Sequence, residues 1–283
     1  MGIHIQISPP GLKVDFYGRP MLPNTTPNPG AYPHDPECAN KLEQLAPNST
    51  IIYSASDHSG NIVFVDTELN TTNPKGKKIK IKPSERKRIG LVLGDSIICH
   101  RSTLTPITLA LRTCDCIPLV IWDKSHFGVV HVSNINLCSY RTENFKGSIL
   151  KSLFQYLDPK NCHVIVGPSI GGIHYGDCKH YGYTETVQQD DGSHLINQLF
   201  KEYPNINISR QKGRGMIYFQ WGAIIVGILK SHGVDPRAIQ NEYNLCTMCF
   251  AEILYSNRAA KVALNREEMT KRYGNITLVR TTA

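Results

Sequence analysis

The sequence has no apolar run of the roughly 18 residues that a membrane-spanning helix needs, so we expect no contact with a membrane. Its first residues, MGIHIQISPPGLKVDF, lack the basic start, apolar stretch and small-residue cleavage site of a signal peptide. The phosphate-binding P-loop and the dinucleotide-binding glycine fingerprint are missing as well. These absences predict a cytoplasmic protein that does not use the common nucleotide-binding loops.

Cysteine occurs in an odd number, nine residues, so at least one cannot pair within the chain. Since no secretion signal is seen, we expect a reducing compartment, where cysteine serves metal binding or catalysis. The net charge of +8 favours anionic partners such as phosphorylated metabolites. Much of this charge lies between Lys75 and Arg88, a segment without the aromatic residues that nucleic-acid grooves usually contain. We therefore expect a solvated basic hairpin, inserted around residues 73–90, and no nucleic-acid partner.

The hydrophobic pattern predicts an α+β protein, because strands and helices follow one another without strict alternation. No repeat or linker divides the chain, so residues 1–283 are expected to form one domain. The helical patterns cover residues 37–45, 147–157 and 217–231. The patterns typical of strands cover residues 51–53, 61–65, 90–98, 107–111, 117–122, 128–132, 163–168 and, around a C-x-x-C motif, 241–255.

Three residues that suit a zinc ion stand at the ends of predicted strands: His58, Cys116 and His131. Two imidazoles and a thiolate are common zinc ligands, and three protein ligands leave a fourth position open for water or substrate. The spacing of these residues alone does not establish a zinc site. Cys116 could also be a small residue buried in the apolar core, and His131 could be a hydrogen-bonded core histidine. Multicopper oxidases require repeated His-x-His pairs, and the sequence has none. Cys246-Thr-Met-Cys249 could supply half of a structural zinc site, but the sequence has no second C-x-x-C motif.

Separated blocks of the sequence keep the order of the motifs of one known family. The blocks are Phe16-Tyr-Gly-Arg19 (F-x-x-R), Asp57-His58-Ser59-Gly60 (Q-V-H-G), Gly94-Asp95-Ser96 (A-D-A), Arg112-Thr113-Cys114-Asp115-Cys116 (R-T-A-D-C), His131 to Asn136 (H-A-G-W-R-G), Gly167 to Gly171 with Tyr175 (G-P-A-I-G…Y), and Cys246 to Cys249 with Tyr255 to Arg258 (C-T-x-C…Y-S-x-R). In these blocks the chain resembles the YfiH/YlmD family, also called laccase-domain or "polyphenol oxidase" proteins.

The resemblance implies a four-layer α/β/β/α sandwich of mixed sheets. It also implies a Zn²⁺ ion held by His58, Cys116 and His131, which would then be the catalytic residues. The activity it implies is cytosolic purine nucleoside phosphorolysis, in which adenosine, inosine or methylthioadenosine reacts with phosphate to give the base and a ribose 1-phosphate. Adenosine deamination is implied as a second activity, and amidase-like editing of a peptidoglycan precursor is attributed to some bacterial members.

Four further residues are assigned to substrate binding. Arg19 is expected to grip phosphate, because a guanidinium forks onto two oxygens. Arg112 and Asp115 are expected to set orientation and charge near the metal, although a purely structural ion pair between them would also explain both. Tyr175 is assigned to substrate binding because it stands at the position of the tyrosine in the G-P-A-I-G…Y block.

One block departs from the family pattern, which makes this chain a divergent member. After His131 the sequence is V-S-N-I-N, so that Asn134 and Ile135 stand where the family has Trp-Arg. Replacing Arg by Ile removes a cation and five hydrogen-bond donors. Two alternatives therefore stay open: a metal-free hydrolase or amidase with Cys116 as nucleophile and His131 as base, and a binding protein that keeps the fold without turnover.

Overall fold

A computed structural model describes most of the chain. The described residues are 3–18, 36–56, 58, 60–73, 82–83, 88–103, 106–137, 148–170, 201–205, 211–213, 216–218, 221–247, 249–256, 259 and 274–282.

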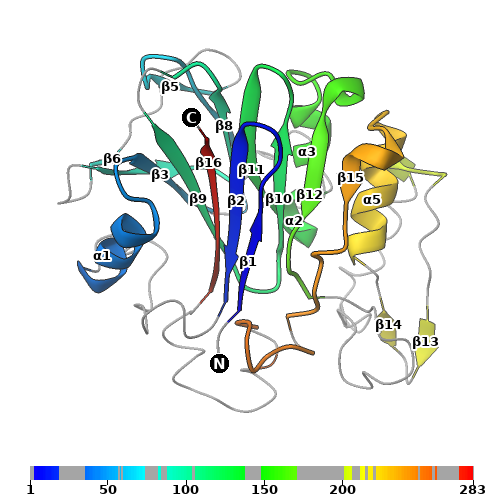
Figure 1. Cartoon of the computed structure of the whole chain (residues 1–283). Coiled ribbons are helices and arrows are strands. Elements are labelled where there is room, and N and C mark those ends of the chain that lie inside the picture. The colour runs from blue at the N-terminus through cyan, green and yellow to red at the C-terminus, as the bar shows by residue number, and fades with distance from the viewer. Residues whose placement is uncertain are drawn as a thin grey trace.

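Two seven-stranded mixed sheets form the centre of the molecule (Figure 1). Sheet A holds, in spatial order, β1 (His4–Ile7), β2 (Leu12–Tyr17), β16 (Asn275–Thr281), β9 (Ile107–Thr113), β3 (Thr50–Ala55), β7 (Ile89–Leu93) and β6 (Lys82–Pro83). Sheet B holds β15 (Ile239–Gln240), β12 (His163–Val166), β10 (Ile117–Trp122), β11 (His126–Val132), β8 (Ser96–His100), β4 (Ile62–Val65) and β5 (Thr71–Thr72).

The described helices lie on the outer sides of the two sheets (Figure 1). They are α1 (Pro36–Leu45), α2 (Asn134–Leu137), α3 (Ile149–Leu153) and α5 (Trp221–Ser231), with 3-10 turns at Pro159–Asn161 and Pro236–Ala238. A small separate hairpin consists of β13 (Gln211–Gly213) and β14 (Met216–Tyr218). None of the helices in the described part of the chain is long and apolar enough to cross a membrane.

The layers pack against one another through three apolar cores. Side chains alternate along β10 and β11, so that successive residues belong to two different cores. Val120 and Val129 belong to the inner core, which lies between the sheets. Leu119 and Val130, one residue away in each strand, belong to the core that sheet B shares with α3 and α5. A third core lies between sheet A and α1, where Leu42 is fully buried. The α/β/β/α sandwich is therefore confirmed.

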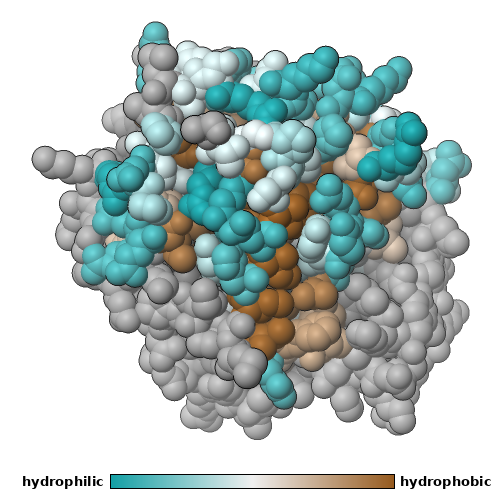
Figure 2. All heavy atoms as spheres, in the orientation of Figure 1, coloured by the Kyte–Doolittle hydropathy of each residue, from teal (hydrophilic) through white to brown (hydrophobic). Residues whose placement is uncertain are grey.

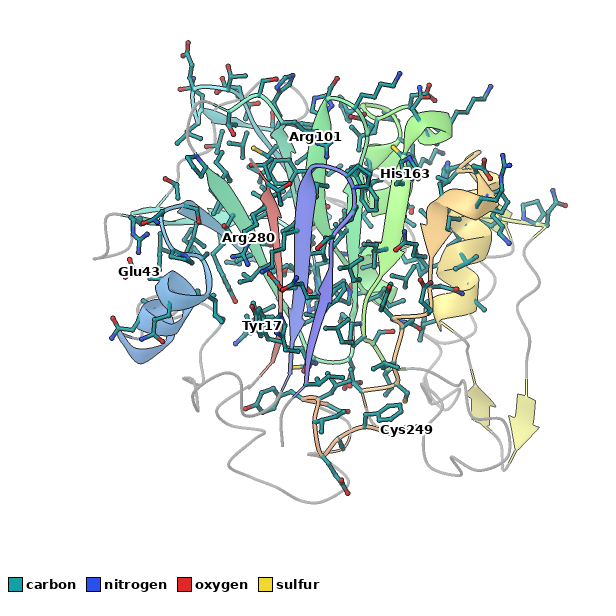
Figure 3. All side chains as sticks on the ribbon, viewed as in Figure 1. Tyr17, Glu43, Arg101, His163, Cys249 and Arg280 are labelled. Carbon is teal, nitrogen blue, oxygen red and sulfur yellow. The ribbon has the colours of Figure 1, made fainter. Side chains whose placement is uncertain are left out.

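A buried charged group fastens one edge of sheet A to α1. The Asp15 carboxylate, with no exposed surface, accepts hydrogen bonds from Arg280 at 2.8 Å and contacts His4 Nε2 at 2.8 Å. Arg280 also donates to the carbonyl of Leu45, the last residue of α1, at 2.6 Å. Burial, with Asp15 nearby, raises the pKa of Tyr17 to about 12. Figure 3 labels Tyr17 and Arg280 on this side of the sheet.

A hydrophobic stripe runs down the middle of the face seen in Figure 2, beside edge strand β1. Along β1, His4 and Gln6 are exposed, whereas Ile5 and Ile7 are half-buried. Ile5, Ile7 and Tyr243 pack against the inner core. We attribute the stripe to the rim of this core, where the gap between the two sheets reaches the surface.

Most of the predicted elements are present, but three predictions were wrong. Residues 90–98 do not form one strand. They include most of β7 in sheet A and the start of β8 in sheet B, and the chain crosses from one sheet to the other between these two strands. The helix predicted from residue 217 begins at Trp221, because Met216–Tyr218 pairs with Gln211–Gly213. Residues 241–255 form no strand, since i→i+4 backbone hydrogen bonds such as Phe250 N–H to Cys246 O (3.0 Å) coil the segment into turns.

Phe127 tests the inner core, because its ring is fully buried between the sheets. We expect Phe127→Ala to lower the free energy of unfolding by about 3–5 kcal/mol through lost burial and the cavity left behind. Leu93→Ala, at a side chain 50% exposed, should cost less than about 1 kcal/mol. Denaturant unfolding of both variants measures the difference, and equal losses would contradict the layer assignment.

Candidate metal centre

The predicted ligands meet at one end of the sandwich. Strand β9 ends beside Tyr17, because Arg112 and Tyr17 both pair with Ile276. The chain then passes through Cys116 into β10, whose far end at Trp122 pairs with His163. Figure 3 shows Tyr17 toward the lower end of the strands and His163 at the upper end, so Cys116 lies at the lower end.

Strand register brings Cys116 and His131 to the same face of sheet B. His131 pairs with Pro118, and Cys116 precedes Pro118 by two residues, so the two side chains are diagonal neighbours. His131 also continues the row of Phe127 and Val129, which point into the inner core. Both candidate ligands therefore lie at the mouth of the gap between the two sheets.

His58 completes the group from the turn after β3. Its donor atoms and those of Cys116 and His131 lie within 4.8 Å of one another, and its ring is 4.8 Å from the His131 ring between centroids. In a tetrahedral zinc site, bonds of about 2.0–2.3 Å place neighbouring donor atoms roughly 3.3–3.8 Å apart. Small side-chain rotations would thus suffice for one ion, and the residues fit a His/Cys/His metal site. Within the described part of the chain, this is the group that meets the geometric requirement for a metal ion.

Asp95, in the crossing between β7 and β8, ties the two histidines together. Its Oδ1 atom is 3.0 Å from His131 Nδ1 and accepts the backbone N–H of His58 at 3.1 Å. Its Oδ2 atom accepts the backbone N–H of Gly60 at 2.6 Å. An ionised carboxylate only accepts hydrogen bonds, so Nδ1 of His131 must carry the proton. Nε2 of His131 is therefore the ring nitrogen that can bind a metal, once the metal displaces its proton.

The backbone of His58 has a conformation that few non-glycine residues adopt, with φ at +60°. Such a residue persists only where its surroundings hold it, and it often marks a functional site. Here the two hydrogen bonds from the turn to Asp95 supply that restraint. The turn thus directs the His58 side chain toward Cys116 and His131.

The electrostatics of the group favour a positive charge at its centre. Burial acts to lower the pKa of His131, but its interactions with Cys116 and Asp95 outweigh this effect and raise the pKa to about 10. Burial likewise acts to raise the pKa of Asp95, but its bonds to His131, Gly60 and Asn136 outweigh it and lower the pKa. In the metal-free protein a protonated His131 compensates the charge of the Asp95 carboxylate, and a metal cation would take over that role.

Two of the predicted substrate residues, Arg112 and Asp115, lie within the described part of the chain. Arg112 lies in β9, partly exposed, with its side chain packed against Gly274. Asp115 adjoins Cys116 and accepts a hydrogen bond from Thr247 at 2.8 Å, while its carbonyl accepts the N–H of Ile170 at 2.9 Å. Asp115 thus fastens the C-x-x-C segment and the G-P-S-I-G block to the start of β10.

The remaining predictions have different outcomes. Arg19 and Tyr175 lie outside the described residues, as does most of the basic hairpin, of which β6 pairs with β7. Asn134 and Ile135 form the first turn of α2.

Gly167 of the G-P-S-I-G block packs so tightly against the ring of Phe16 that a side chain there would clash. Two of the blocks quoted above therefore meet at a packing contact between the sheets.

Two residues that organise the centre, Asp95 and Asn136, were not among the predicted site residues. The apolar pattern predicts a continuous strand through Asp95, whereas the Gly-Asp pair at residues 94–95, part of the A-D-A block, indicates a break. The Asn136 side chain is fully buried and donates to the carbonyl of His131 at 2.8 Å. Nothing in the local sequence indicates that long-range role.

Comparison with known proteins agrees with this architecture. Residues 37–270 match the model of a family described as "multi-copper polyphenol oxidoreductase laccase". No curated protein matches the chain.

Three solved structures share the fold. A Neisseria meningitidis protein of the DUF152 family is 13% identical, with 98% of each chain covered and a TM-score of 0.64. YlmD from Geobacillus stearothermophilus is 16% identical, with 97% of this chain and 93% of that one covered and a TM-score of 0.63. The hypothetical protein YfiH of Bacillus licheniformis is 15% identical, with 96% and 93% covered and a TM-score of 0.61. Because the family match spans well over half of the chain, and these structures share its layers, the chain belongs to the YfiH/YlmD family, the laccase-domain proteins.

Proposed function

We propose that the chain is a zinc-dependent purine nucleoside phosphorylase, with adenosine deamination as a possible second reaction of the same centre. The observation that carries the proposal is the convergence of His58, Cys116 and His131, whose donor atoms lie within 4.8 Å of one another. Membership of a family whose description names an enzyme supports a catalytic role for this convergence.

The exposure of the three side chains favours a catalytic metal over a structural one. Structural zinc sites are usually closed by four protein ligands, whereas catalytic sites keep one position open. His131 is only 3% exposed, but His58 and Cys116 are both partly open to solvent. A small molecule can therefore approach from the side of His58 and Cys116, while the buried His131 keeps the centre in place.

A bound zinc ion would supply Lewis-acid polarisation of a substrate oxygen and a lowered pKa for water. The chain's own residues would do the positioning. Asp95 holds the proton on Nδ1 of His131 and keeps the His58 turn in its unusual conformation. Arg19 remains the residue proposed to grip phosphate during attack on the ribose C1′.

A second candidate function rests on a specific contact. The Cys116 sulfur lies within 4.8 Å of a ring nitrogen of His131, and a cysteine beside a histidine is the arrangement of a cysteine nucleophile with its base. A metal-free hydrolase or amidase would use this pair directly. Copper is the alternative metal at this site, because a ligand set of two histidines and one cysteine suits copper as well as zinc. Metal content and the reaction products separate these possibilities.

Metal analysis and a phosphorolysis assay test the proposal together. The purified protein should contain about one zinc per chain, and adenosine, inosine or methylthioadenosine should release the base only when phosphate is present. Cys116→Ala should lose both the zinc and the activity, because it removes the thiolate ligand. Zinc affinity should also fall as the pH is lowered, since protons compete for the ligands.

Cys162→Ala is the matched control, because Cys162 is buried at the opposite end of β10 and β12 and should keep both properties. Base release without any bound metal, abolished by Cys116→Ala, would favour the hydrolase. Stoichiometric copper would overturn the zinc assignment. Rates equal to those of Cys116→Ala on every substrate would overturn the phosphorylase and favour a binding protein.

Asp95→Asn tests the support of the two histidines. An amide keeps one acceptor oxygen, but its NH₂ group must face an N–H of Gly60, His58 or His131. We expect zinc affinity to fall by about 10–100-fold, measured by competition with a chromogenic chelator. Asp123→Asn is the control, because Asp123 similarly accepts two backbone N–H groups, those of Ser125 and His126, in a turn at the other end of β11. Unchanged affinity in Asp95→Asn would contradict this role.

A further inference from the structure

The carbonyl of His131 needs a hydrogen-bond donor that the sheet does not supply. In an antiparallel strand the N–H and C=O of one residue point to the same side. The N–H of His131 points toward β8 and donates to the carbonyl of Asp95 at 2.6 Å. The N–H of Asp95 cannot return this bond, because it donates to the carbonyl of Asn61 at 2.9 Å. The His131 carbonyl, at the end of the ladder, would thus be left without its regular partner.

Asn136 fills this position from the first turn of α2. Its Nδ2 atom donates to the His131 carbonyl at 2.8 Å, and its amide helps to lower the pKa of Asp95. The side chain has no exposed surface. One buried amide therefore holds the backbone of the candidate ligand His131, next to the hydrogen bond between the His131 ring and Asp95.

Ser133 fixes Asn136 in turn. The N–H of Ser133 donates to Asn136 Oδ1 at 2.7 Å, and Ser133 Oγ accepts the N–H of Asn136 at 3.2 Å. These reciprocal bonds form a capping box at the start of α2, with Asn in the place of the usual Glu or Gln. The oxygen of the Asn136 amide thus serves the helix, whereas its nitrogen serves the metal centre.

We propose that Asn136 is a positioning residue that sets the metal affinity of the His58/Cys116/His131 centre through His131 and Asp95. In the family pattern that the chain resembles, both Ser133 and Asn136 are replaced by glycine, which has no side chain to make these bonds. The capping box is thus a feature of this chain, at the place where it departs from that pattern. The inference rests on the metal site of the proposed function but not on the reaction.

Two variants separate the helix cap from the positioning role. Asn136→Ala removes the amide, and we expect zinc affinity to fall about tenfold, with altered visible bands in the Co²⁺-substituted protein. Ser133→Ala removes only the hydroxyl of the cap, so it should lower the thermal stability of the metal-free protein and leave zinc affinity and the Co²⁺ spectrum unchanged. Chelator competition measures the affinities.

Asn161→Ala is the control, because Asn161 also donates from its side-chain amide to an aspartate, Asp158, at 2.8 Å, but in an exposed turn. Should Asn136→Ala fail to fold, Asn136→Gly and Asn136→Asp replace it. Glycine is the residue of the family pattern, and aspartate keeps the acceptor for Ser133 while losing the donor to His131. Either should weaken zinc binding.

Four outcomes decide between these possibilities. Weakened zinc binding in the Asn136 variants, with normal binding in Ser133→Ala and Asn161→Ala, supports the proposal. Equal affinity in the wild type and the Asn136 variants overturns it but leaves the proposed function intact. A wild-type protein that binds no zinc or cobalt overturns both, whereas zinc binding without phosphorolysis overturns the proposed reaction alone.

Discussion

The geometry of the centre depends on the buried carboxylate of Asp95. It accepts hydrogen bonds from the His131 ring and from the backbone of the His58 turn. A carboxylate without exposed surface is costly to bury unless it is well bonded, and here its partners are the groups that orient the candidate ligands. The same bonds that make the buried charge tolerable therefore also fix the tautomer of one histidine and the strained backbone of the other.

Asn136 extends this restraint beyond the strands. Its amide satisfies the last carbonyl of the ladder at His131, which would otherwise be a buried polar group without a partner. A fully satisfied buried network holds its members rigidly, whereas a half-satisfied one is unfavourable. In this chain, Asn136 supports the backbone of His131 within the same block in which Asn134 and Ile135 stand in place of the Trp-Arg pair of the family pattern.

The sequence predicts the local parts of this structure well and the long-range parts poorly. The runs at 117–122 and 128–132 are apolar on both faces, as expected for strands covered by core on each side. Strand β2 was missed because Lys13 and Asp15 interrupt its apolar pattern. The partners that explain a buried Asp15 are His4 and Arg280, and Arg280 lies at the other end of the chain. His58, Cys116 and His131 could be suggested as ligands from their chemistry, but their convergence follows from sheet register, which local patterns do not contain.

A metal bound by these three residues would also stabilise the fold, because the ligands come from both sheets. His58 follows β3 of sheet A, whereas Cys116 and His131 belong to the ends of β10 and β11 in sheet B. Asp95 lies where the chain crosses from one sheet to the other. An ion held by all three side chains would therefore join the sheets at the open end of the gap, where the inner core ends. Because such a site cannot exist in the unfolded chain, its binding energy adds to the stability of the sandwich. Asp95 and Asn136 would then influence both the metal affinity and the stability of the sandwich through the hydrogen bonds that position His58 and His131.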